Sequence, residues 1–344
     1  MLRILSAAFR FLASMGLSVV LLLLLMLLTF LGTLQQVSQG LYEVQREYFG
    51  SLFLVHWIGG VIPLPLPGAY LLLALAFVNV TCGAVVRARK GWRTAGILIA
   101  HIGILMLLAG GFVTYKYAVR GNLTLYEGEQ SDQFKSYEQW ELVVSGQQGS
   151  LVIPGHEFVH LTGERSRVFF SKSLPFDLTI KGYASNADVA SVTAGNQGEG
   201  TVVNGQRMIV LSSAREAEEN VPAAIVFTKD KGSGGTEEHI VSAMAKTPLT
   251  IKSGNSDWTI SLNRRSWLLP FTIKLDRFTR ELYPGTNMPK VFMSNVTKIE
   301  GDSQQAVKIS MNEPLRHKGY TLYQASWGPS NAGPNDRLFS TLAV

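Results

Sequence analysis

The stretch Val19-Val-Leu-Leu-Leu-Leu-Leu-Met-Leu-Leu28 lies within a run of residues 14–34 that holds no charged side chain. As a helix, this run is long enough to cross the hydrocarbon core of a membrane, which is about 30 Å thick. Two further apolar runs follow at 69–86 and 95–114. The first run is too long for a cleaved signal peptide, and other spans come after it. The sequence therefore predicts three N-terminal transmembrane helices.

Basic residues mark one end of these runs. Arg3 and Arg10 precede the first run, and Arg87, Arg89, Lys90 and Arg93 lie in the link between the second and the third. Short loops rich in Lys and Arg stay on the cytoplasmic side of a membrane. We therefore expect the N-terminus and the 87–93 link inside the cell, and the 35–68 loop and everything after about 115 outside it.

The outer loop 35–68 is rich in aromatic residues. Its segment 42–62 combines aromatic side chains such as Tyr48 and Trp57 with acidic and basic ones. Trp and Tyr are enriched where membrane meets water, so this segment predicts a helix lying at the outer interface. The prolines of Pro63-Leu-Pro-Leu-Pro67 are expected to end that helix before the second span.

From Asn122 onward the apolar residues recur with a period of two, which is typical of half-buried strands. The clearest strands are expected at 140–144, 202–211, 223–227, 258–262 and 307–311. Turn-forming Gly, Asn and Asp residues separate them, and only 214–220 looks helical. The fold class predicted is a membrane anchor, residues 1–114, followed by a large antiparallel all-β domain, residues 115–344.

A weak internal repeat occurs in the β region. Leu174-Pro-Phe-Asp-Leu-Thr-Ile-Lys-Gly-Tyr183 resembles Leu269-Pro-Phe-Thr-Ile-Lys-Leu-Asp-Arg-Phe278. Either two similar β units follow each other, with a boundary near 230–250, or one type of turn is used twice. We favour two units.

Composition excludes some classes of function. The net charge is +6, but several of the positive charges are the Arg and Lys residues at the ends of the apolar runs. The excess of positive charge therefore does not indicate a nucleic-acid partner. Cys82 is the single cysteine, which rules out an internal disulfide and a Cys-x-x-Cys redox pair. Cys82 itself fits a small apolar packing residue.

His156-Glu-Phe-Val-His160 matches the zinc-protease signature H-E-x-x-H. That signature needs a helix, because helical spacing brings both imidazoles to one metal ion. Pro154-Gly155 and the β-rich flanks predict a strand, a turn and a strand instead. A metalloprotease is therefore disfavoured, and no metal site is expected.

His101 is the sharpest candidate for function. An ionisable residue inside a membrane span is costly and indicates a functional site, and neutral imidazole is a good iron ligand. The small residues Gly96, Ala100, Gly103 and Gly110 form a stripe that helical spacing places on another part of the helix surface from His101. His101 therefore either faces a cofactor or a partner subunit, or hydrogen-bonds a neighbouring helix. His56, in the outer loop, is a weaker ligand candidate that is otherwise solvated.

Three stretches together resemble the ResB (CcsB) family of System II cytochrome c biogenesis. They are Gly32-Thr-Leu-Gln-Gln36, His101-Ile-Gly-Ile-Leu-Met-Leu-Leu-Ala-Gly-Gly111 and Asn312-Glu-Pro-Leu-Arg-His-Lys-Gly-Tyr-Thr-Leu-Tyr-Gln-Ala-Ser326. The resemblance covers nearly the whole chain in the right order, and 312–326 is its most specific part.

The resemblance implies a multi-pass protein of a bacterial cytoplasmic (inner) membrane, with its large domain in the periplasm. It implies a ResC (CcsA)-like membrane partner, apocytochrome c as client, and transient heme b shared with the partner through His101. A separate thiol reductant protein is expected, since the outer region has no cysteine. The chain would be an accessory subunit of a heme lyase with no catalytic residue of its own.

The main alternative is a membrane-tethered β domain that acts as an assembly or adhesion module without heme. One feature departs from the family pattern, because members carry a fourth span after the outer domain. The sequence reaches Val344 where that span is expected. The span is then missing by truncation, absent in this branch, or supplied by another chain.

Overall fold

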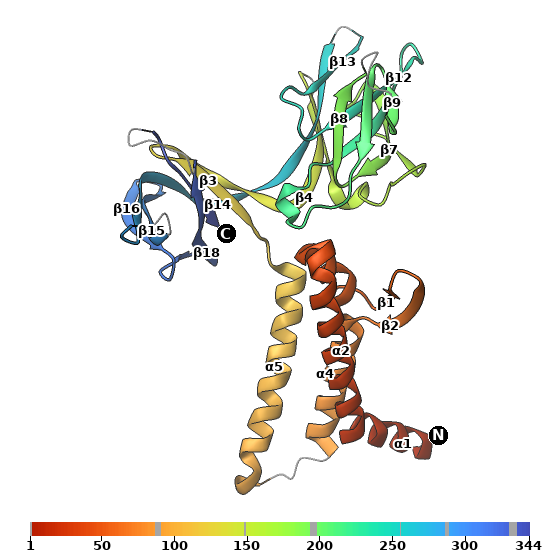
Figure 1. Cartoon of the computed structure of the whole chain (residues 1–344), viewed down its shortest axis with the longest axis vertical. Coiled ribbons are helices and arrows are strands. Elements are labelled where there is room, and N and C mark those ends of the chain that lie inside the picture. Colours follow the sequence, from red (N-terminus) through yellow and green to blue (C-terminus); the bar gives the residue numbers. More distant parts are fainter. Residues whose placement is uncertain are drawn as a thin grey trace. The chain divides into compact units, whose positions relative to one another are not determined.

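The computed structural model describes residues 2–86, 91–147, 149–192, 198–254, 256–285, 289–329 and 336–344 (Figure 1). Its contacts divide the chain into two compact units. The helical unit comprises Met1–Ala118 with Ser213–Glu219, and the β unit comprises Val119–Ser212 with Asn220–Val344. The loop 213–219, which includes the short 3-10 helix Ala217–Glu219, therefore packs with the helices although it connects two strands.

The helical unit contains a helix at each predicted span. These are α2 (Met15–Gln39), α4 (Ala69–Val86) and α5 (Ala95–Tyr117), and α1 (Leu2–Leu12) precedes them. By length and composition, Met15–Gln39 and Trp92–Tyr117 could cross a membrane, while the apolar helix at 69–85 is shorter. Three spans and their orientation therefore stay predictions. The basic residues at 87, 89 and 90 lie outside the described part.

A buried asparagine joins α1, α2 and α4. Asn79 accepts a hydrogen bond from the Ser18 hydroxyl at 2.6 Å, and its amide donates to the Leu12 carbonyl at 2.5 Å. Ser14 caps α2 by accepting from the backbone N–H of Leu17 at 3.1 Å. Side-chain hydrogen bonds of this kind join helices in an apolar environment, where the hydrophobic effect gives little drive for association.

The prediction of an interfacial helix over 42–62 is wrong beyond residue 49. After α3 (Leu41–Val44) and a π-helical turn, η1 (Gln45–Phe49), the chain forms an antiparallel hairpin of β1 (Phe53–Ile58) and β2 (Ile62–Pro67). Gly59 and Gly60 have φ values of 60° and 74°, which suits the turn. At positions 63, 65 and 67 the backbone N–H would point away from β1. Proline has no N–H, so its presence at these positions removes no hydrogen bond between β1 and β2.

The β unit confirms the antiparallel all-β prediction. Its strands include β3 (Gly121–Tyr126), β4 (Gln130–Gly146), β5 (Gly149–Pro154), β6 (Ser166–Phe169), β7 (Phe176–Ala184), β8 (Ala187–Ser191), β9 (Thr201–Val203), β10 (Gln206–Val210), β11 (Ala223–Asp230) and β12 (Thr236–Ser242). They continue with β13 (Leu249–Ser253), β14 (Ser256–Leu282), β15 (Pro289–Glu300), β16 (Ser303–Ser310), β17 (Leu315–His317), β18 (Tyr320–Gly328) and β19 (Phe339–Ala343). Among the described residues every strand pair is antiparallel.

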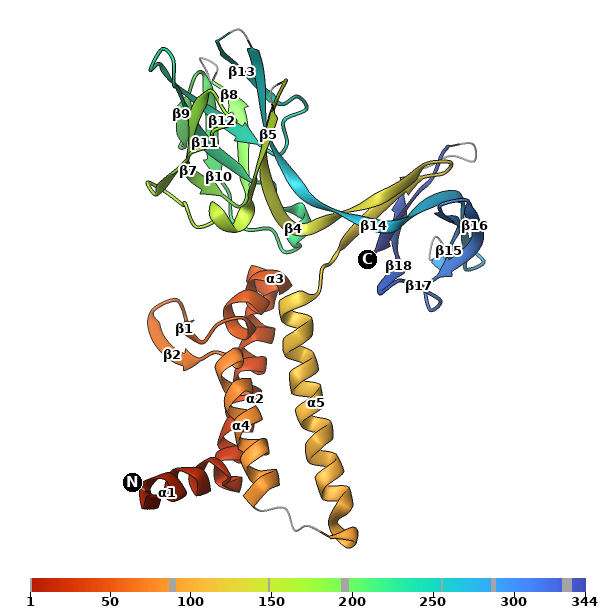
Figure 2. The ribbon, with the colours of Figure 1, turned by 180° about the vertical axis from the view of Figure 1, so that it is seen from behind.

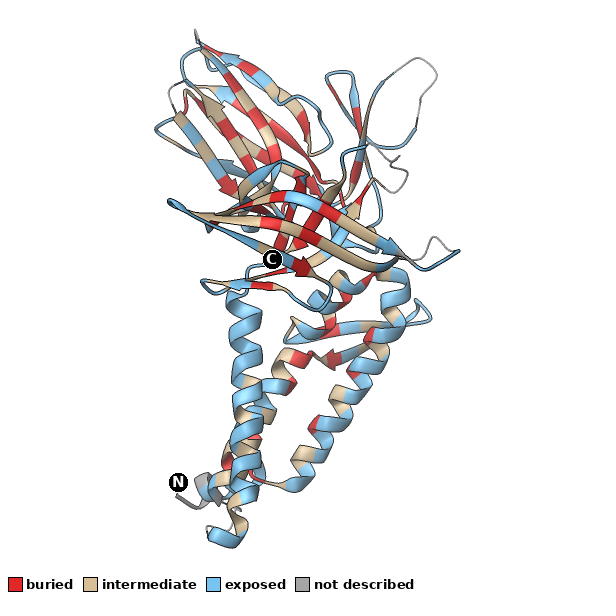
Figure 3. Cartoon of the chain, turned by 90° about the vertical axis from the view of Figure 1, so that its left-hand side faces the viewer, coloured by how far each residue is buried: buried red, intermediate tan, exposed pale blue. Residues whose placement is uncertain are grey.

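The described strands form three sheets in this unit. The largest runs β16-β15-β14-β4-β3-β19-β18-β17, with β5 beside β4 and β13 beside β14, and the others run β12-β11-β7-β6 and β8-β10-β9. Buried and exposed residues alternate along many strands, as Figure 3 shows. The turn at Asn204-Gly205 has φ values of 47° and 75°, as expected for the Asn-Gly hairpin that connects β9 and β10.

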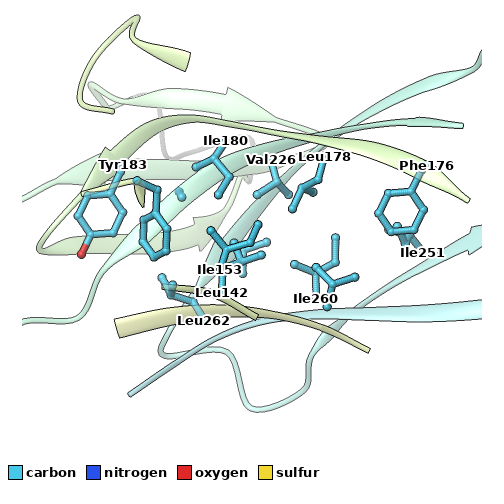
Figure 4. Close-up of a cluster of buried hydrophobic side chains, with 14 of the residues drawn as sticks. Leu142, Ile153, Phe176, Leu178, Ile180, Tyr183, Val226, Ile251, Ile260 and Leu262 are labelled. Atoms are coloured by element: carbon cyan, nitrogen blue, oxygen red, sulfur yellow. The ribbon is translucent and has the colours of Figure 1, made fainter. Parts of the chain in front are cut away.

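Apolar side chains of the β unit gather in two main cores. The sandwich core lies between the β4/β5/β14 region and the β7/β11 sheet, and includes Leu142, Leu178 and Ile260 (Figure 4). Trp258 belongs to the same core. The second core includes Phe134 and Ile273. The long strands β4 and β14 contribute to both cores, so the cores are joined by continuous strands.

The internal repeat places equivalent residues in different cores. Leu174, Phe176, Leu178 and Ile180 lie in the sandwich core, while Leu269, Phe271, Ile273 and Leu275 lie in the second core. All eight are buried. The contacts divide the described chain into a helical and a β unit only, so the boundary near 230–250 and the 114/115 division stay predictions.

Candidate functional site

The imidazole of His101 is held by its own helix. Its Nδ1 lies 2.8 Å from the carbonyl oxygen of Ile97, one turn earlier in α5. A carbonyl only accepts hydrogen bonds, so Nδ1 carries the proton and donates. In the neutral ring the lone pair is then on Nε2. A histidine that ligates a metal usually has this arrangement, with its other nitrogen donating to a carbonyl or carboxylate.

His101 lies on the stripe of α5 that also approaches α4. Leu105 and Leu108 are half-buried, as His101 is, and Phe112 and Tyr115 continue the same helical spacing. The rings of Phe112 and Tyr115 lie 6.2 and 5.9 Å from the ring of Tyr70 on α4. The glycine stripe is different, because a Cβ atom at Gly96, Gly103 or Gly110 would have open space around it.

No second ligand joins His101 within the described part of the chain. No group of three or more His, Cys, Asp or Glu side chains in the described residues could hold a metal ion. His101 therefore offers a single nitrogen on an apolar helix. Such a nitrogen could hold the iron of a porphyrin from one side.

His56 has a different environment on β1. The hydroxyl of Tyr48 lies 2.5 Å from its Nδ1, and the two rings meet edge to face at 6.1 Å. Burial, and to a lesser degree the Glu47 carboxylate, raises the pKa of the Tyr48 phenol, which stays protonated and able to donate. His56 is thus half-buried and held by a partner rather than simply solvated. When Tyr48 donates, the proton of the neutral imidazole is on Nε2, so that nitrogen has no free lone pair.

The H-E-x-x-H motif does not lie on an α-helix. Residues Gly155–Glu157 form a 3-10 turn between β5 and β6, as the flanking sequence predicted in outline. The side chain of His156 is mostly exposed, and Glu157 pairs with Arg167. The two histidines therefore lack the helical spacing that a zinc protease requires.

Sequence reasoning missed a charged cluster around His317. His317 Nε2 lies 2.8 Å from Glu300 Oε2, and Lys318 pairs with the other oxygen of the same carboxylate. Lys298 donates to His317 Nδ1 at 3.5 Å. Lys298 and Glu300 lie on β15 and His317 lies on β17, two strands that do not pair with each other. Only the three-dimensional fold could have revealed the cluster.

Glu300 makes the cluster sensitive to acid. Hydrogen bonds from Lys318 and then His317 lower the pKa of this carboxyl from 4.5 to about 2. Because the pKa of Glu300 is lower in the folded chain, its ionised carboxylate stabilises the folded state at pH values above 4.5. This contribution is lost as the pH falls towards about 2. We expect the melting temperature of the full chain to fall less between pH about 5 and about 2 in Glu300→Gln than in the parent.

The measurement is thermal unfolding in detergent, followed by circular dichroism across that pH range. Glu164→Gln is the control, because Glu164 is almost fully exposed and pairs with Lys181 in water. It is expected to follow the parent curve. If Glu300→Gln also follows the parent curve, the cluster does not contribute to stability.

Comparison with known proteins identifies the family. The model of the ResB-like family matches residues 73–205 and 242–338. His101 and His317 fall inside the matched segments, whereas His56 lies outside them.

Three curated relatives align with parts of the chain. Protein NrfI of Wolinella succinogenes is 23% identical over 253 residues, which cover 73% of this chain and 25% of NrfI. The cytochrome c biogenesis protein CcsB of Microcystis aeruginosa is 28% identical over 104 residues, covering 30% of this chain and 20% of its own. CcsB of a Synechococcus species is 36% identical over 70 residues, covering 20% and 16%.

The aligned parts thus span a quarter or less of the length of each relative. The family match itself covers more than half of this chain. The chain therefore belongs to the ResB-like family.

Proposed function

We propose that this member of the ResB-like family is a membrane subunit that takes part in cytochrome c maturation. It would work with a ResC/CcsA-like partner in moving heme across the membrane and attaching it to apocytochrome c. The family match and the name that two relatives carry, cytochrome c biogenesis protein, support the role. The observation that carries the proposal for this chain is the lone pair on His101 Nε2, presented by an apolar helix.

His101 would hold heme b from one side. Ile97 keeps the ring in the tautomer that leaves Nε2 available, and the partner subunit would supply a further ligand to the iron. Bound heme brings iron for this nitrogen and vinyl groups to which cytochrome thiols are joined. With Cys82 as its single cysteine, the chain cannot keep those thiols reduced through a dithiol of its own. A separate reductant protein is therefore part of the proposal.

The proposed location follows from the helices. α2, α4 and α5 would span a bacterial cytoplasmic membrane, with the N-terminus inside and the β unit in the periplasm. The two longest apolar helices support this arrangement. In this orientation residues 115–344 would meet apocytochrome c where heme is attached, and the chain would act as an accessory subunit of a heme lyase.

The test is heme retention by the full chain co-expressed with its partner. We expect the complex to show a heme Soret band, and His101→Ala to lose most of it because this variant lacks the nitrogen that would hold the iron. Imidazole added to that variant should restore part of the band by filling the vacated position. His160→Ala is the matched control, since His160 is exposed on the turn after β5.

His56→Ala separates the two candidate ligands. Because His56 is held by Tyr48 and lies outside the matched segments, its removal is expected to leave the band unchanged. Equal heme content in His101→Ala and the parent would overturn the assignment of His101. A complex without any heme would favour the assembly or adhesion module instead.

A further inference from the structure

The β1–β2 hairpin has two faces of different character. Leu54 and Leu66 are buried against α2 and α4 in the core of the helical unit, and His56 turns to Tyr48 on the same face. The opposite face and the tip are exposed although they are apolar. They consist of Phe53, Val55, Trp57, Ile58, Val61 and Ile62.

The sequence around the hairpin holds no formal charge. Between Glu47 and Arg87 there is no Asp, Glu, Lys or Arg. Contiguous apolar surface on a protein in water is small unless something covers it. The exposed face of the hairpin also lacks hydrogen-bonding side chains apart from the Trp57 indole, so it offers little that could specify a protein partner.

The prolines of β2 point to the kind of partner. Residues 63, 65 and 67 would direct their N–H groups away from β1, and proline has none. The outer edge of β2 therefore has no backbone donor in this register, and it cannot extend into a sheet with another chain. The same lack of donors removes one cost of placing a strand edge next to lipid, where unpaired N–H groups are expensive.

The hairpin is continuous with an apolar helix. Gly68 alone separates β2 from Ala69, where α4 begins. A Cβ atom at Gly68 would meet the Ser51 carbonyl oxygen at 2.1 Å, so the junction is tightly packed. Figures 1 and 2 both show the hairpin extending sideways from the α2–α4 pair. It would therefore lie along a membrane that α4 crosses.

We propose that the β1–β2 hairpin is a lipid-contacting element, with its exposed face and tip at the boundary between headgroups and acyl chains. Trp57 would lie at the depth where tryptophan is enriched. This inference rests on the proposed membrane location of the helical unit, and its test separates the two.

The test measures contact with lipid at single labelled positions. In a Cys82→Ala background, Val61→Cys at the hairpin tip receives a nitrobenzoxadiazole label, and the full chain is placed in phosphatidylcholine vesicles. Met106→Cys on α5 reports on the membrane location, and Val210→Cys on β10 is the matched apolar control. Val61, Met106 and Val210 are 77%, 70% and 66% exposed, so labels should leave the cores intact.

Lipids with doxyl groups near the headgroup end of the acyl chain act as quenchers. We expect the label at position 61 to lose about half of its emission or more, because interfacial elements lie about 5–10 Å into this boundary. The label at 106 should respond to quenchers deeper in the acyl chain, and the label at 210 to neither.

The other outcomes separate the two proposals. If 106 is quenched while 61 behaves like 210, the hairpin proposal is overturned and the membrane location stands. If neither 61 nor 106 is quenched, the membrane location fails and the hairpin proposal with it. The same measurement in the complex with the co-expressed partner completes the test, because quenching at 61 that disappears there would assign the surface to the partner protein.

Discussion

Replacing Trp258 by alanine is expected to lower the free energy of unfolding of the β unit by about 3–5 kcal/mol. Trp258 on β14 is fully buried in the sandwich core, and its ring meets Phe176 edge to face at 5.8 Å. It also fills the space above Gly146, the residue opposite it on β4. A Cβ atom at Gly146 would lie 2.6 Å from the indole ring. Two strands are therefore shaped around this side chain, and its removal leaves a cavity.

The measurement is denaturant unfolding of the full chain in detergent, followed by circular dichroism of the β signal. Trp92→Ala is the matched control, because Trp92 is 98% exposed and its loss should change stability by less than about 0.5 kcal/mol. Trp258→Phe should cost less than Trp258→Ala, since it retains most of the apolar ring. It also removes an indole N–H that has no hydrogen-bond partner among the described residues. A loss below about 1 kcal/mol in Trp258→Ala would mean that the core collapses around the gap.

Local patterns predicted the β unit well because its strands are half-buried and its turns are chemically specific. The alternation in β7, where every second residue from Phe176 to Ile180 is buried, is visible in the amino-acid sequence. The Asn204-Gly205 turn is equally local. Which strand pairs with which is a different matter. β3 lies between β4 and β19, and its pairs with β19 join residues more than 200 positions apart, which no local pattern encodes.

The hairpin at 53–67 shows how a correct local observation can lead to a wrong element. Alternate prolines do stop a helix, and the sequence was interpreted in that sense. The same period of two also fits one edge of a strand, because each missing N–H then lies on the unpaired side. The aromatic residues before the prolines suggested an interface in either case, so the environment was predicted independently of the secondary structure.

The sequence was enough to select the candidate residue of the site, but not to predict its hydrogen bonds. His101 stands out because it is the single ionisable residue in the apolar run 95–114. Its tautomer is set by the hydrogen bond from Nδ1 to the Ile97 carbonyl oxygen. That bond depends on the side-chain rotamer, which the sequence does not reveal. His56 was similar in sequence, but Tyr48 occupies its Nδ1. The ion pair of His317 with Glu300 joins residues 17 positions apart on β15 and β17, two strands that do not pair with each other, so it was invisible before folding.

Leu178→Ala and Ile273→Ala are each expected to lower the free energy of unfolding by about 2–5 kcal/mol, because both side chains are fully buried. These positions are equivalent in the internal repeat, yet Leu178 lies in the sandwich core and Ile273 in the second core. Residues that share no neighbours contribute independently, so the double variant should show the sum of the two losses within about 0.5 kcal/mol.

The double-mutant cycle therefore asks whether the repeat marks two independent β units. Denaturant unfolding of the parent, both single variants and the double variant provides the four free energies. Val168→Ala on the edge strand β6 is the control, since its side chain is exposed and its loss should be small. The strands β4 and β14 run through both cores and could transmit strain from one to the other. A coupling energy above about 1 kcal/mol would show that they do, and the β unit would then fold around one continuous core despite its internal repeat.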